Sequence, residues 1–176
     1  AHLRESVARA GEEGAVLMVL VMDTPGGLSS SMREITQLIQ AAPFPVAAWV
    51  SPQGARGASA GAFLIEASHI AAMAPGTNIG AAHPVVALGG DIPDTDMKKK
   101  VVSDFAAQMR SLAGLRGRDA AAAEKMVTDS VSYTADEALE AKVIDLVASD
   151  LDDILAWARG RTFLVGDREL QFSLKG

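Results

Sequence analysis

The sequence contains no cysteine and few aromatic residues. Phe, Trp and Tyr together make up 5% of its 176 residues. Without cysteine there is no disulfide framework, no thiolate nucleophile and no cysteine-based zinc site. The sequence also has no uninterrupted run of 18 apolar residues, so we expect no part of it to span a membrane. Any catalytic nucleophile must therefore be a hydroxyl, an amine or a carboxylate.

Basic residues are fewer than acidic residues. Sixteen Lys and Arg stand against 22 Asp and Glu, which gives a formal net charge of −6. Nucleic-acid binding depends largely on neutralising phosphates, so this balance excludes it as the expected function. Apolar residues make up 49% of the chain, enough for a packed core, and the length fits one domain over residues 1–176.

The first half alternates between apolar runs, glycine-containing loops and helical spacing. Residues 15–22 are continuously apolar, which predicts a strand buried on both faces. Residues 46–50 and 70–74 predict two further strands, and residues 28–41 and 58–68 predict helices between them. This order favours an α/β fold with a mostly parallel sheet and ligands at the carboxyl ends of the strands.

The second half is predicted to be mainly helical. Residues 75–96 look like a loop, and a capping box, Thr-x-x-Glu, starts a short helix at Thr134. The catalytic core is expected at about 15–148, followed by a carboxyl-terminal helix and hairpin at 151–175. The remaining predicted elements are a long helix at 96–115, a shorter helix from Asp119, a strand at 143–148, a helix at 151–158 and a hairpin at 162–174 turning near Gly166.

Two glycine loops are candidates for chemistry. Residues 23–27 (DTPGG) end the first strand, and adjacent glycines allow backbone N–H groups to converge on an oxyanion. On spacing alone, a plain strand-to-helix turn is the better interpretation of this loop. The second loop, residues 54–62, places Ser59 where a glycine turn enters a helix. There Ser59 is either a nucleophile near the helix dipole or an ordinary helix cap.

A nucleophilic serine needs a base. His69 begins an apolar strand and is expected to be structural, whereas His83 lies in a loop that can pass over the site. The run Lys98–Lys100 offers lysines, for which a solvated helix end is the plainer interpretation. Helical phase favours Lys98, which shares a face with Val102. Spacing alone does not select the base.

Three motifs together resemble the amino-terminal protease domain of the NfeD family, membrane-bound serine proteases that are partners of stomatin-like proteins. The resemblance covers most of the chain and implies the fold of the Clp protease and crotonase superfamily, with repeated β-β-α and β-α units. It also implies a first strand that this sequence lacks. The motifs are residues 23–28 (DTPGGL), 54–61 (GARGASAG) and 72–84 (AMAPGTNIGAAHP).

The resemblance implies a serine–lysine dyad. The nucleophile matches Ser59 and the base matches Lys100, with a helix beginning near Lys100 that leaves Lys98 in the loop. The oxyanion would be held by Gly26 and Gly27 together with the backbone N–H of Ala60. No cofactor is implied, and the three histidines show no metal-ligand spacing.

The resemblance also implies a location, an oligomeric state and a substrate. The chain would be an extracytoplasmic domain of a membrane protein, attached to the membrane only through parts absent here, and a homodimer. Its substrate would be the apolar carboxyl-terminal segment of a stomatin-like partner. We expect a hydrophobic cleft formed by Leu28, Phe63, Val85 and Leu88, closed by a lid at 85–96 that removes water from Lys100. Arg56 is expected to support its loop.

Three alternatives remain. His83 can serve as the base of a Ser-His-Asp protease, with Asp145 or Asp129 orienting it. A crotonase-like acyl-CoA domain uses the same two glycine loops without Ser59 or Lys100. A non-catalytic module would dock extended peptides along a strand edge.

Overall fold

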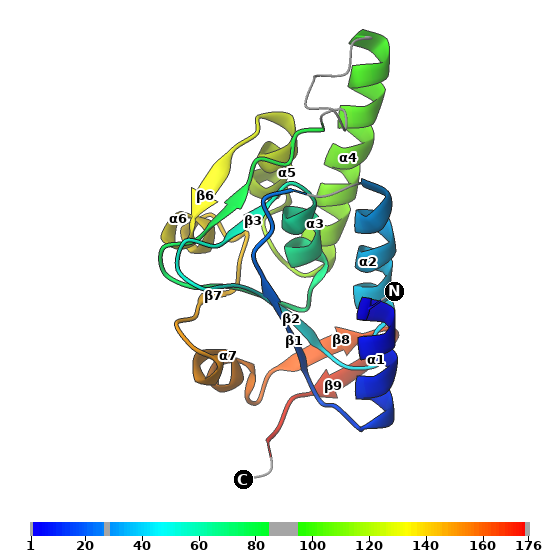
Figure 1. Ribbon diagram of the computed structural model, residues 1–176, viewed down its shortest axis with the longest axis vertical. Helices are drawn as coiled ribbons and strands as arrows, with labels where there is room; N and C mark the ends of the chain where they lie inside the picture. The colour runs from blue at the N-terminus through cyan, green and yellow to red at the C-terminus, as the bar shows by residue number, and fades with distance from the viewer. Residues whose placement is uncertain (1, 27–28, 85–94, 175–176) are drawn as a thin grey trace.

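The computed structural model describes residues 2–26, 29–84 and 95–174 (Figure 1). Its elements alternate between helices and short strands. In order they are α1 (His2–Glu12), β1 (Met18–Met22), α2 (Ser29–Ala41), β2 (Val46–Val50), β3 (Arg56–Ala58), α3 (Ala60–Ala67), β4 (Ile70–Met73), β5 (Asn78–Gly80), α4 (Thr95–Leu115), α5 (Ala120–Thr128), β6 (Ser132–Thr134), α6 (Ala135–Glu140), β7 (Leu146–Val147), α7 (Leu151–Ala158), β8 (Thr162–Val165) and β9 (Arg168–Gln171).

The main sheet is parallel and has the strand order β1-β2-β4-β7. A second sheet, β3-β5-β6, pairs β3 with β5 in parallel and β5 with β6 antiparallel, and β8 and β9 form a hairpin. The predicted α/β fold with a mostly parallel sheet is therefore confirmed. The strands of the second sheet, three residues each, were missed, because segments this short inside glycine-containing loops show no periodicity.

The prediction that residues 15–22 form a strand buried on both faces is wrong. β1 lies at the edge of the main sheet as described, paired only with β2, and the side chain of Val21 is 62% exposed. Val16, just before the strand, is 56% exposed. A continuous apolar run is typical of a central parallel strand, and β2 and β4 fit that expectation better, with most of their residues buried.

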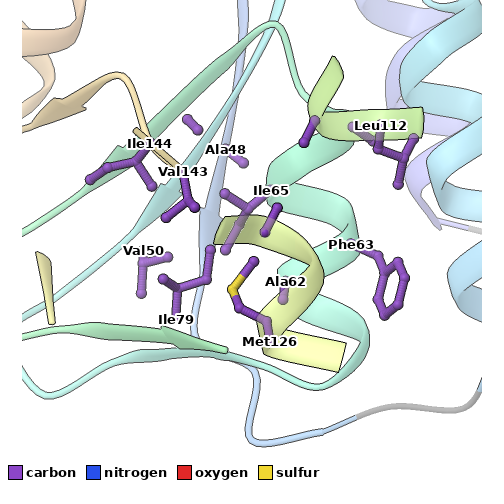
Figure 2. Packing of buried hydrophobic residues seen from close by; sticks show 14 of the residues in the cluster. Ala48, Val50, Ala62, Phe63, Ile65, Ile79, Leu112, Met126, Val143 and Ile144 are labelled. Atoms are coloured by element: carbon purple, nitrogen blue, oxygen red, sulfur yellow. The ribbon is translucent and has the colours of Figure 1, made fainter. Parts of the chain in front are cut away.

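The core divides between the two faces of the main sheet. Successive side chains of a strand point to opposite faces, so Ala48 and Val50 join one hydrophobic cluster and Ala47 joins the other. Figure 2 shows the first cluster, in which Ile65 of α3 and Met126 of α5 lie over β2. The second cluster lies beneath α7 and the β8–β9 hairpin. His69 is buried, and its Nδ1 accepts the Val46 N–H at 3.0 Å, which confirms its structural role.

Candidate active site

The first glycine loop is held against the second. After β1, the Thr24 N–H donates to the Arg56 carbonyl at 2.6 Å, and the Thr24 carbonyl accepts from the Ala58 N–H at 3.0 Å. The Asp23 carboxylate accepts the Arg56 N–H at 3.0 Å. Arg56 thus stabilises the loop through its backbone, while its side chain is exposed. The two loops meet at the carboxyl ends of β1 and β2, as parallel-sheet topology predicts.

Ser59 lies at the meeting point, immediately before α3. Its backbone has φ 52° and ψ −121°, and its side chain makes no capping hydrogen bond. The hydroxyl instead donates to the Ala81 carbonyl at 3.4 Å, a long contact. The Ser59 N–H donates to the Gly80 carbonyl at 3.1 Å, which helps to hold this conformation. The interpretation of Ser59 as an ordinary cap is therefore wrong, because its hydroxyl makes no bond to the helix amides.

Glycine residues let the backbone approach the Ser59 hydroxyl closely. A methyl group at Gly26 would lie 3.9 Å from the Ser59 Oγ, so this glycine flanks the hydroxyl directly. A methyl group at Gly61 would overlap the Thr24 side chain, so α3 and the first loop require glycine to approach this closely. Ala60 is the first residue of α3, where helix N–H groups have no partner within the helix. Gly27 lies outside the described residues.

The lysines lie on α4, which begins at Thr95 and not near Lys100. The expectation that Lys98 stays in a preceding loop is therefore wrong. Lys98 is half-buried, whereas Lys99 and Lys100 are exposed, and the amino-terminal turns of α4 project beyond the rest of the domain in Figure 1. Among the described residues, no hydrogen bond joins Lys100 to Ser59. The predicted lid at 85–96 lies almost entirely outside the described residues.

His83 is bonded to the backbone and not to an acid. Its Nδ1 lies 2.8 Å from the Val127 carbonyl, and because a carbonyl only accepts, this nitrogen carries the hydrogen. Asp145 is paired with Arg118 at 2.8 Å, and Asp129 is exposed at the end of α5. The structure therefore shows neither acid orienting His83, as the Ser-His-Asp alternative requires.

A pocket of about 480 Å³ lies between α4 and α5. We call it the α4–α5 pocket. Its surface is mainly apolar, although charged and hydroxyl residues are among those that line it. Its lining residues are His83, Thr95, Lys98, Lys99, Val102, Ser103, Ala106, Arg110, Glu124 and Thr128.

Of the predicted substrate cleft, the structure describes only Phe63. This side chain is 2% exposed and packs edge-on against Phe105, with ring centroids 5.6 Å apart. It therefore belongs to the core and does not form part of an open surface beside Ser59. Leu28, Val85 and Leu88 lie outside the described residues. Within the described ranges, no three His, Asp or Glu side chains gather closely enough to hold a metal ion.

A charge network around the buried Arg118, at the far end of α3 from Ser59, is not predictable from the sequence pattern. The Arg118 guanidinium is 2% exposed and donates to the carbonyls of Glu66 and Ser68 at 2.9 and 2.8 Å, at the carboxyl end of α3. It also pairs with the carboxylates of Asp145 at 2.8 Å and Glu66 at 3.4 Å. The same Asp145 oxygen, Oδ2, also accepts the Ala71 N–H of β4 at 2.8 Å. Arg118 therefore fixes the helix whose other end presents Ser59.

Burial dominates the electrostatics of this network. Glu66 is fully buried on α3, and burial raises the pKa of its carboxyl to about 8, although Arg118 opposes the shift. Because this pKa lies above 7, we assign a neutral form to Glu66 near pH 7. The shorter ion pair of Arg118 is the one with Asp145.

Comparison with known proteins decides the family. The family model for the NfeD1b amino-terminal domain matches residues 1–160. The chain belongs to the NfeD1b amino-terminal domain family. This NfeD1b domain is 38% identical over 151 residues to the membrane-bound protease PH1510 of Pyrococcus horikoshii. The match covers 86% of this chain but 34% of that protein, so the chain spans about a third of this relative's length.

Solved structures agree on the fold. A lysine-to-alanine variant of the 1510-N membrane-bound stomatin-specific protease, in complex with a substrate peptide, superposes with a TM-score of 0.87 at 35% identity, covering 96% of this chain and 78% of that one. A serine-to-alanine variant gives 0.84 at 34% identity, covering 97% and 82%. ClpP1 of Listeria monocytogenes gives 0.64 at 16% identity, covering 87% and 88%, which supports the ClpP-like fold. None of the described helices is long and apolar enough to cross a membrane.

Proposed function

We propose that this NfeD1b domain is a serine endopeptidase in which Ser59 is the nucleophile and Lys100 the general base. The observation that carries the proposal is the geometry of Ser59. Its backbone lies in a region that costs a non-glycine residue roughly 1–3 kcal/mol, and its hydroxyl is turned away from the helix amides toward Gly26. Strain of this kind, at the junction of two glycine loops, is typical of an activated serine.

The chemistry requires a base and an oxyanion site. Neutral Lys100 takes the Ser59 proton as Oγ attacks the scissile carbonyl carbon, and it then passes this proton to the leaving amine. Water hydrolyses the resulting acyl-enzyme. Backbone N–H groups of Gly26, Gly27 and Ala60 would stabilise the oxyanion, and losing one such donor costs roughly 3 kcal/mol of transition-state stabilisation.

The spacing of the relative supports Lys100 over its neighbours. The two substituted residues of the 1510-N protease, the serine at position 97 and the lysine at position 138, are 41 positions apart. Ser59 and Lys100 are also 41 positions apart. Because a lysine acts as a base only in its neutral form, and Lys100 is exposed here, the proposal requires peptide binding to cover Lys100 and bring it to Ser59.

Substrate and setting follow from the relatives. The 1510-N protease is described as stomatin-specific and PH1510 as membrane-bound. We extend both properties to this chain: its substrate is an apolar segment of a stomatin-like protein, and it acts as the extracytoplasmic domain of a membrane protein. Homodimer formation stays a prediction.

Cleavage of a quenched fluorescent apolar peptide tests the dyad. We expect Ser59→Ala and Lys100→Ala each to lower kcat at least roughly a thousandfold. His83→Ala and Lys98→Ala should keep most of the cleavage rate, and circular dichroism verifies the fold of every variant. Intact cleavage by Lys100→Ala, with loss in His83→Ala or Lys98→Ala, would move the base to that residue. Thioester hydrolysis that survives Ser59→Ala would instead support the crotonase-like alternative.

A further inference from the structure

The hydroxyl of Thr24, in the first glycine loop, is buried and unbonded. Its Oγ1 is shielded from solvent and has no hydrogen-bond partner among the residues that the structure describes. The backbone of Thr24, by contrast, is held by β3, because its N–H donates to the Arg56 carbonyl at 2.6 Å and its carbonyl accepts from the Ala58 N–H at 3.0 Å. Burying a hydroxyl without a hydrogen bond is unfavourable, so we expect this hydroxyl to gain a partner at some stage of the function.

The Thr24 hydroxyl lies against the first turn of α3. A methyl group at Gly61 would overlap the Thr24 Oγ1, so this oxygen occupies the space that a side chain on Gly61 would need. Gly61 is the second residue of α3, and its N–H is one of those at a helix start that have no acceptor within the helix. The unbonded hydroxyl therefore lies beside a helix terminus that needs acceptors.

This terminus lacks the side-chain cap that a helix commonly has. An N-cap side chain usually accepts the N–H of the second or third helical residue. Ser59 occupies the N-cap position of α3 but makes no such bond, because its hydroxyl donates to the Ala81 carbonyl. The N–H of the third residue, Ala62, donates to the Ser59 carbonyl at 3.1 Å. The Gly61 N–H is therefore the donor that a cap would otherwise serve.

We propose that Thr24 is a positioning residue that takes over the capping role of Ser59: in the transition state of acyl transfer, its hydroxyl accepts the Gly61 N–H. The proposal rests on the endopeptidase function above. In the structure the two groups are adjacent but not bonded. The bond forms when the oxyanion draws the N–H groups of Gly26 and Ala60 toward itself, because these residues lie two positions after Thr24 and one position before Gly61. Thr24 thereby joins the two halves of the oxyanion site.

A bond that forms only in the transition state has a distinct kinetic signature. It raises kcat and leaves KM and the stability of the resting chain almost unchanged. Replacing an unbonded buried hydroxyl with a methyl group even removes an unfavourable burial. A threonine with a purely structural role would show the reverse, namely a loss of stability with little effect on kcat.

Isosteric variants measure this signature. With a quenched fluorescent apolar peptide, Thr24→Val should lower kcat roughly three- to tenfold, as expected for one hydrogen bond, and keep KM within about twofold. Thr24→Ser keeps the hydroxyl and should have a kcat within about twofold of the wild type. In urea unfolding, Thr24→Val should be at least as stable as the wild type. The matched control is Thr36→Val, which should leave kcat unchanged, because Thr36 is a buried threonine of α2 that donates to the Arg33 carbonyl at 2.9 Å.

A serine-directed fluorophosphonate tests the same role without peptide cleavage. A bond forms between the Ser59 Oγ and phosphorus, fluoride leaves, and the base takes the serine proton. The phosphoryl oxygen of the product then occupies the place of the oxyanion. Thr24→Val should slow this labelling by the same factor as kcat. Amide hydrogen exchange followed by NMR should show the Gly61 N–H to be more protected after labelling in the wild type, but not in Thr24→Val.

The outcomes separate this proposal from the catalytic one. Unchanged kcat and unchanged labelling in Thr24→Val, or equal protection of the Gly61 N–H in both labelled proteins, would overturn the role of Thr24 and leave the serine protease assignment intact. A loss of kcat that Thr24→Ser shares would also overturn it, because the hydroxyl would then not be the group responsible. A wild type that is neither labelled nor able to cleave would overturn the endopeptidase function, and the role of Thr24 with it.

Discussion

Arg118 and the lysines of α4 are all cations, but the fold treats them in opposite ways. Arg118 is 2% exposed and bonds to two carboxylates and to the carbonyls that end α3. Lys99 and Lys100 are exposed on helical turns that project beyond the rest of the domain (Figure 1). The partners of Arg118 belong to the chain itself, whereas the proposed function assigns Lys100 to the reaction with substrate.

The contrast separates positioning from catalysis. The buried Arg118 holds α3, and so Ser59, in one place before any peptide arrives. Lys99 and Lys100 are exposed at the amino end of α4 and hold no part of the core in this way. The predictions below test this division.

The largest effect is expected from removing the buried cation. Arg118→Ala leaves the mostly buried Asp145 without its ion-pair partner and the carbonyls at the end of α3 without their donor, so the free energy of unfolding should fall by about 3–5 kcal/mol. The matched control is Arg110→Ala, which removes the partly exposed pair with Glu124 and should cost less than about 1 kcal/mol. Urea unfolding followed by circular dichroism measures both. Equal losses of unfolding free energy in the two variants would show that burial of an arginine does not determine how much it contributes to stability.

A smaller effect is expected from pH. The pKa of Glu66 is about 8 in the folded chain and near 4.5 when unfolded, so between these values the folded state holds one more proton. Stability from this residue is therefore greatest at acidic pH and is lost as pH rises through 8. Between pH 5 and pH 7.5, the wild type should lose roughly 3 kcal/mol more stability than Glu66→Gln. If the free energy of unfolding changed with pH in the same way in the wild type and in Glu66→Gln, the assignment of a neutral carboxyl to Glu66 would be contradicted.

The smallest effect, with the opposite sign, is expected from the exposed lysines. Replacing Lys99 and Lys100 with Gln removes like charges from the positive end of the α4 dipole, so stability should rise by a few tenths of a kcal/mol at low salt. Thermal unfolding at low and high salt measures the change. A loss above about 1 kcal/mol would mean that these lysines hold the fold together, as Arg118 does.

The sequence predicts the framework of the fold well. The strands at 46–50 and 70–74, the helix after Asp119 and the capping box at Thr134 are all confirmed. Each depends on local information, namely apolar runs or capping residues. The edge position of β1 was not predictable in this way, because an apolar run does not reveal which neighbouring strands are present.

The candidate site was predictable in part. The resemblance directed attention to Ser59 and Gly26, and the structure places them together. The apolar residues around Ser59 also suggest Phe63 for the cleft, but which face of α3 is buried depends on α4, whose Phe105 lies 42 residues after Phe63. The Arg118 network was missed for a similar reason. Its members come from α3, the turn before α5 and the segment before β7, and a charged residue is expected at the surface unless its partners are known.

The backbone of Ser59 has a consequence for engineering this domain. A glycine would adopt φ 52° without strain, so Ser59→Gly is expected to gain stability while removing the hydroxyl. A laboratory search for heat-resistant variants that scores folding alone would therefore tend to discard the proposed nucleophile. Such a search has to keep Ser59 unchanged, because the substitution that raises stability also removes the hydroxyl required for the proposed activity.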